Sequence, residues 1–157
     1  MLNPEPITDA IVAALQDIPL VVAEMGGDPT RIQAFHYRPG QDLRLVERVY
    51  KMTPPEILVA FNQTLAGNFD GETIFKHRFE VYIRVGNLAT MPDPHSFEYL
   101  WWALTSAKMN STGQNIRYVN LVFGLEIMDT PSISHHVDED GQDYFCAYFV
   151  FPEIGDN

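Results

Sequence analysis

The sequence has a single cysteine, Cys146, among its 157 residues. One thiol excludes both an intrachain disulfide and a metal centre built from several thiolates, and we expect Cys146 to fill space in a strand. The sequence also lacks an apolar run approaching the roughly 20 residues that span a bilayer. Its first five residues carry no lysine or arginine of the kind that begins a signal peptide. These absences predict a protein made and kept in the cytoplasm, with no membrane partner.

Positive charge is missing from both ends of the chain. Residues 1–30 carry five carboxylates and residues 118–157 carry eight, and neither stretch contains lysine or arginine. All ten lysines and arginines lie between Arg31 and Arg117, where eight carboxylates leave a net charge of +2. This separation suits complementary contact between copies of the protein, or an acidic surface that repels nucleic acid while a basic one docks elsewhere. It equally fits a soluble protein with acidic ends, and it lacks the basic footprint of a DNA-binding protein.

Motifs that would identify an enzyme are also missing. Gly26 and Gly27 do not begin a phosphate-binding loop, and no serine lies in a nucleophile elbow. Candidate metal ligands concentrate between residues 134 and 143: His135, His136, Asp138, Asp140 and Asp143. The spacing of a calcium loop fails because no glutamate follows at its twelfth position. We interpret the segment as a solvated hairpin loop with an Asp-Gly turn, and we assign no catalytic residue, metal or cofactor.

The most informative feature present is the stretch from Phe75 to Val85, in which apolar and polar residues alternate strictly. A period of two over this length predicts a half-buried β-strand. The strand is longer than the usual five or six residues, as is common where a hairpin reaches a neighbouring subunit. We expect its polar row to face water or a partner, with Lys76, Arg78, Tyr82 and Arg84 as interface candidates. On the apolar row, we expect His77 to be a satisfied core or interface histidine.

The first third of the chain predicts a helix and a less regular segment. Asn3 followed by Pro4 is typical of a helix start, and we expect the helix to end before Pro19. Residues 20–24 predict a short strand. We interpret residues 26–53 as an insertion. Within it, residues 32–37 could be extended, and helical spacing predicts a second apolar face at Leu43, Val46, Val49 and Tyr50. The basic residues beside that face add the interface candidates Arg44, Arg48 and Lys51.

The rest of the chain predicts strands around one further helix. Residues 57–61 predict a strand buried on both faces, and residues 67–72 predict a turn into the long strand. The later elements are a helix capped by Asp93, a strand at 116–127, a connecting loop at 129–143 and a last strand at 144–151 ended by Pro152. Trp102, on the flank of that helix, is the remaining interface candidate.

Taken together, these elements predict one domain over residues 1–157. The fold class is α+β: a mostly antiparallel sheet of four to five strands, with two helices packed on one face and a long protruding hairpin.

Four segments carry a resemblance to a known family. They are Glu56–Phe61 after a pair of prolines, the long strand at Phe79–Val85, the helical segment Phe97–Leu104 and the closing strand Asp143–Phe151. Their order resembles that of the tail terminator (tail completion) proteins of long-tailed bacteriophages. The resemblance covers most of the chain except residues 26–53.

The resemblance implies a structural virion protein that is not an enzyme. Such a protein forms a hexameric ring that caps the tail tube, ends its polymerisation and joins the tail to the neck or head. The implied partners are other copies of the chain, the tail tube protein, a neck or head-completion protein and, in a contractile tail, the sheath. Genome DNA would pass through the ring without specific binding, consistent with an acidic lumen. The alternatives are a neck adaptor, an acidic protein-binding module and, least favoured, a small metal-dependent enzyme.

Overall fold

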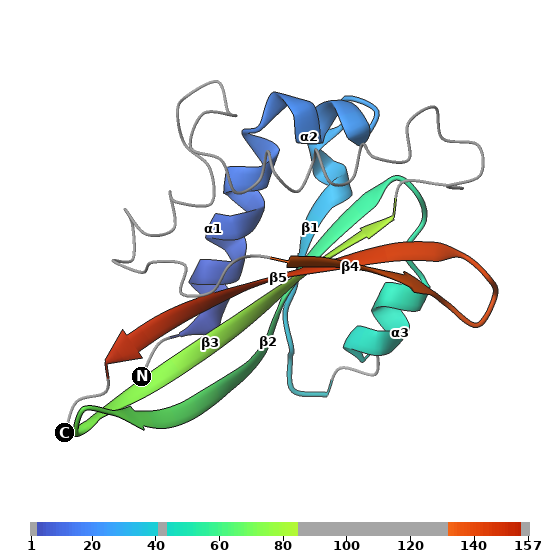
Figure 1. Ribbon diagram of the computed structural model, residues 1–157. Helices are drawn as coiled ribbons and strands as arrows, with labels where there is room; N and C mark the ends of the chain where they lie inside the picture. Colours follow the sequence, from blue (N-terminus) through green and yellow to red (C-terminus); the bar gives the residue numbers. More distant parts are fainter. Residues whose placement is uncertain (1–2, 41–43, 85–131, 155–157) are drawn as a thin grey trace.

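The computed structural model describes residues 3–40, 44–84 and 132–154. Over these residues the protein is α+β, with short helices around one long, twisted sheet (Figure 1). The helices are α1 (Pro4–Gln16), α2 (Pro19–Glu24) and α3 (Leu45–Tyr50), with a 3-10 turn η1 (Pro29–Arg31). The strands are β1 (Ile32–Phe35), β2 (Glu56–Phe69), β3 (Glu72–Arg84), β4 (Ser132–Val137) and β5 (Asp143–Ile154).

The sheet is mixed. Its described strands lie in the order β1-β2-β3-β5-β4. β1 runs parallel to β2, whereas β2–β3, β3–β5 and β4–β5 are antiparallel pairs. A parallel neighbour requires a crossover connection, and the chain between β1 and β2 supplies one that contains α3. Residues 26–53 therefore contribute a strand to the sheet itself.

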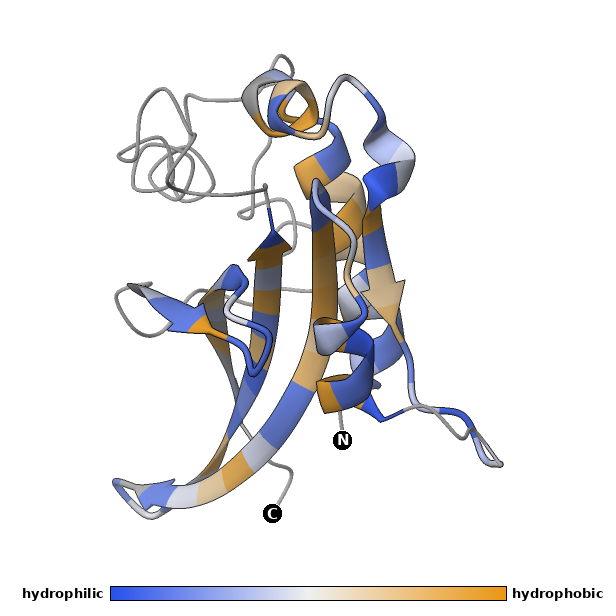
Figure 2. Cartoon of the chain, turned by 90° about the vertical axis from the view of Figure 1, so that its right-hand side faces the viewer, coloured by the Kyte–Doolittle hydropathy of each residue, from blue (hydrophilic) through white to orange (hydrophobic). Residues whose placement is uncertain are grey.

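Alternation along the strands gives the sheet two apolar faces, seen as bands in Figure 2. On one face, α1 and α2 cover Ile57, Val59 and Val81. On the other face, Leu45 and Val49 of α3 and Met52, two residues after the helix, pack against Leu58 and Ala60. The described helices thus lie on both faces. The two helices predicted on one face were α1 and the helix after Asp93, and the second of these lies outside the described residues.

The helix start at α1 is as predicted. Asn3 accepts a hydrogen bond from the backbone N–H of Glu5 at 3.1 Å, and Pro4 is the first helical residue. The predicted strand at residues 20–24 is wrong, because those residues form α2. Pro19 both follows the end of α1 and occupies the first turn of α2, a position that proline favours because it needs no N–H donor there.

The helix α3 exposes two of the apolar side chains that the sequence pattern assigned to its buried face. Leu45 and Val49 are buried, whereas Val46 is 60% exposed and Tyr50 is 47% exposed. The predicted apolar face is therefore correct for Val49 and wrong for Val46 and Tyr50. Val46 and Tyr50, four residues apart, therefore share an outward side of the helix.

The strands β2 and β3 form one ladder, and each is longer than the strand predicted at its place, residues 57–61 and 75–85. They pair from Glu56–Arg84 to Phe69–Glu72, with a bulge between Phe61 and Gln63. The turn between them consists of Asp70 and Gly71, both with positive φ, which is the geometry of a two-residue type I′ hairpin turn.

The last two described strands also differ from the prediction. Residues 132–137, expected within a loop, form β4, so the connection to β5 contains only residues 138–142. β5 continues past Pro152, which pairs with Lys76. The expected helix after Asp93, Trp102 and the expected strand at 116–127 lie outside the described residues. Among the described helices, none is long and apolar enough to cross a membrane.

Candidate functional site

The predicted interface residue Arg84 is buried inside the protein. Its side chain is 0% exposed, and Nη2 donates a 2.7 Å hydrogen bond to Asp138 Oδ2. Nε and Nη2 also approach the carbonyl oxygen of Val49, at 3.4 and 3.3 Å. The guanidinium lies 5.3 Å from the ring centroid of Tyr144. The prediction that Arg84 faces water or a partner is therefore wrong: its charge is matched within the chain.

The other interface candidates of the same row, Tyr82, Arg78 and Lys76, are less buried than Arg84. Tyr82 packs partly into the second apolar cluster and donates a hydrogen bond to Glu80. Burial and that carboxylate raise the pKa of Tyr82. Arg78 lies 4.2 Å over the ring of Tyr148 and 3.2 Å from Glu80, with 37% of its side chain exposed. Lys76 is exposed, so it alone of these candidates is a fully surface cation.

The basic residues of α3 split into two kinds. Arg48 forms an ion pair with Glu56, and Glu56 also accepts the backbone N–H of Thr53 at 2.9 Å. This pair joins α3 to the start of β2. Arg44 and Lys51 are exposed at the two ends of the helix, so they remain available to a partner.

The candidate metal ligands His135, His136 and Asp138 each bond to a different partner within the protein. His135 Nε2 lies 2.6 Å from Asp143 Oδ1, whereas His136 Nε2 lies 2.7 Å from Ser134 Oγ. Asp138 accepts the backbone N–H groups of Asp140 and Gln142 through its other oxygen. The Gln142 N–H, together with Arg84, holds the pKa of Asp138 below its ordinary value. These side chains stabilise a hairpin turn and do not converge on one point.

His77 is buried and bonded through both ring nitrogens. Its Nδ1 lies 2.8 Å from Thr64 Oγ1 and its Nε2 lies 2.6 Å from Glu153 Oε2, with only 2% of the side chain exposed. The three residues come from β2, β3 and β5, so the network ties neighbouring strands together. A fully bonded histidine at this depth fits the structural role predicted for it.

One group of potential metal ligands was missed by the sequence pattern. Glu5 and Asp9, one turn apart on α1, lie with His36 so that one ligand atom from each falls within 4.8 Å of the others. His36 Nε2 is 2.7 Å from Asp9, and Arg38 binds both oxygens of Glu5 at 2.6 and 2.7 Å. The bond to Arg38 lowers the pKa of Glu5. We interpret the group as an ionic network that holds α1 against the chain after β1, since Glu5 is already bonded to Arg38 and Asp9 to His36.

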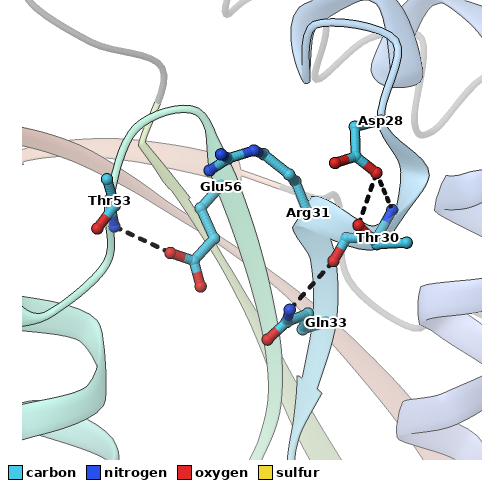
Figure 3. Close-up of a pocket in the computed structure, with 6 residues that line it drawn as sticks. All are labelled: Asp28, Thr30, Arg31, Gln33, Thr53 and Glu56. Atoms are coloured by element: carbon cyan, nitrogen blue, oxygen red, sulfur yellow. Dashed lines mark hydrogen bonds between the residues drawn. The ribbon is translucent and has the colours of Figure 1, made fainter.

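A pocket lies beside the first residues of β1 and β2 (Figure 3). Its volume is about 440 Å³, and its lining is polar: Asp28, Thr30, Arg31, Gln33, Thr53 and Glu56. Many of these groups bond to one another or to backbone, as Figure 3 shows for Thr53 with Glu56 and for Asp28 with Thr30. The lining contains no histidine or cysteine that would act as a base or nucleophile near neutral pH.

In the described residues, the candidate metal ligands and the buried histidine thus form hydrogen bonds and ion pairs that hold the fold together. No protein-family model matches the chain, and a search of curated proteins finds no relative.

Proposed function

We propose that this protein is a structural component of a bacteriophage tail. In this role it forms a ring that caps the tail tube, stops tube polymerisation and joins the tail to the neck or head. Its partners are further copies of itself, the tail tube protein and a neck or head-completion protein, and its place is in the virion. A neck adaptor is the alternative within the same class.

The observation that carries the proposal is the division of β2 into a buried and an exposed half. Residues 57–60 of β2 are buried, whereas residues 65–68 are exposed. Leu65 in the second half is 56% exposed. Paired strands that continue past the core are suited to contact a neighbouring chain, and we propose that this half is the protruding hairpin expected from the sequence.

The net charge supports passage of DNA. A formal charge of −11 gives the ring a negative potential, so an inner surface that shares this sign repels phosphates and leaves DNA free to move. The same charge also favours the second candidate, an acidic module that binds a basic protein. That module would be a stable monomer, whereas the tail role requires self-association in solution or on the tail tube.

The test is the assembly phenotype of a phage that carries this gene after the gene is inactivated. Capping predicts tail tubes of uncontrolled length that do not join heads, and resupply of the wild-type protein should restore normal particles. Particles with tails of normal length attached to heads, assembled without the protein, would rule out the proposed function.

A further inference from the structure

The outward side of α3 exposes apolar side chains between two cations. Val46 and Tyr50 are 60% and 47% exposed, one turn apart on this six-residue helix. Arg44 lies before them and Lys51 after them, both exposed. A single exposed apolar residue is ordinary in a soluble protein, but neighbouring ones framed by charge are typical of a contact surface.

The apolar surface continues from α3 onto the β4–β5 hairpin, which lies beside α3 in Figure 1. Tyr144 of β5 lies close to Tyr50, whose proximity adds to the rise that burial causes in the pKa of Tyr144. His136 stacks on Tyr144 with ring centroids 5.1 Å apart, and His136 is exposed. We call these residues the α3 patch: Arg44, Val46, Tyr50, Lys51, His136 and Tyr144.

Arg84 makes the α3 patch a fixed surface. Its guanidinium binds the Val49 carbonyl of α3 on one side and Asp138, two residues after His136, on the other. Since the side chain of Arg84 is 0% exposed and that of Asp138 only 5%, the helix and the hairpin keep one relative position. A preorganised surface loses less entropy when it binds.

Exposed side chains of complementary charge lie at the end of α2. α1 and α2 cover the other apolar face, and residues 1–30 carry five carboxylates without one lysine or arginine. Glu24, at the end of α2, and Asp28, in the loop that follows, are exposed. We call these two residues the acidic end of α2.

We propose that the α3 patch docks against the acidic end of α2 of a second copy of this chain. Different surfaces then meet at each contact, and such heterologous contacts repeat from copy to copy until they close into a ring. The inference rests on the proposed function for the ring and adds which two surfaces form it. Arg44 and Lys51 face Glu24 and Asp28, while Val46 and Tyr50 provide the apolar centre.

Charge exchange between the two surfaces tests the contact. Light scattering of the purified protein at low salt should show association for the wild type and at least roughly tenfold weaker association for R44E/K51E, since each reversed charge turns attraction into repulsion. Adding E24K/D28K to that variant should restore association. Circular dichroism melting of each variant establishes that it is folded.

The matched control adds E139K/D140K to R44E/K51E. It has the same net charge as the rescued variant, but it changes the exposed acidic turn beside the α3 patch. We expect no rescue. If E139K/D140K restores association and E24K/D28K does not, the inference is overturned. That result would indicate a symmetric dimer in which the α3 patch of each copy contacts the turn at Glu139 and Asp140 of the other.

Two further outcomes also overturn the inference. One is unchanged association of R44E/K51E, and the other is a wild type that stays monomeric at every concentration and low salt. Neither decides the proposed function, which the phenotype of the inactivated phage gene tests separately.

Discussion

The buried guanidinium of Arg84 joins α3, β3 and the β4–β5 turn at one point. Its partner Asp138 has only 5% of its side chain exposed, and removing one member of a buried pair leaves the other charge without compensation. Asp138→Ala should therefore lower the free energy of unfolding by about 3 to 5 kcal/mol. Arg84→Met should cost less, because Asp138 keeps the N–H groups of Asp140 and Gln142. Urea denaturation measures both, and equal small losses would contradict this account of the pair.

The same carboxylate makes stability depend on acid. The pKa of Asp138 is lower in the folded protein than its ordinary value, so the group binds protons more readily when unfolded. Its stabilising contribution should be complete above about pH 4, the ordinary value for aspartate, and should be lost as pH falls through the lower folded pKa. The difference in unfolding free energy between wild type and Asp138→Asn should therefore shrink with acidification. A difference that stays constant from neutral pH to pH 3 would be inconsistent with this linkage.

Cys146 should react slowly. Burial raises the pKa of its thiol to about 12, so almost no thiolate is present at neutral pH, and the thiolate is the reactive form. Iodoacetamide should modify Cys146 much more slowly in the native protein than in guanidinium. Equal rates would show that the thiol is exposed in solution.

These residues also show what alternation in a sequence can predict. The pattern along β3 correctly separated Phe79, Val81 and Ile83 from the polar row, because a strand places alternate side chains on opposite faces. It could not predict that α3 and Asp138 cover Arg84, since those contacts join residues 35 and 54 positions away. The ionic network of Glu5, Asp9, His36 and Arg38 was missed for the same reason.

At the scale of elements, the β2–β3 turn depends on backbone conformation. Gly71 has φ +83°, and a Cβ there would meet nothing within 4 Å, so any cost of substitution comes from the backbone alone. Gly71→Val should destabilise the protein by about 1 to 2 kcal/mol. The control is Gly67→Val in β2, where φ is ordinary and space is equally open. Thermal melting should separate the two, and a larger loss for Gly67→Val would contradict the turn assignment.

Local signals predicted some elements and misassigned others. The Asn3-Pro4 start of α1 was predictable because a cap and a first-turn proline act within a few residues. The apolar run after Pro19 is too short for its pattern to distinguish a strand from a helix. In the structure these residues form a helix, and Val21 and Met25 pack into the same apolar cluster as α1. Val46 and Tyr50 of α3 were assigned to the wrong side of the helix for a similar reason, since a six-residue helix offers less than two turns of pattern.

For the whole molecule, the account predicts self-association driven by opposite charges around an apolar centre. Sodium chloride should weaken the association, because exposed charges are screened within about 10 Å at 0.1 M salt. The apolar centre should leave part of the affinity at high salt. Association that strengthens with added salt would favour a purely apolar contact and would contradict the role given to Arg44 and Lys51.

The solution mass of the purified protein, measured by light scattering across concentration at low and moderate salt, tests the ring most directly. The account predicts a mass that rises with concentration from the 17.9 kDa monomer toward a hexamer, and that falls again with salt. A mass that remains 17.9 kDa at every concentration and salt would contradict self-association.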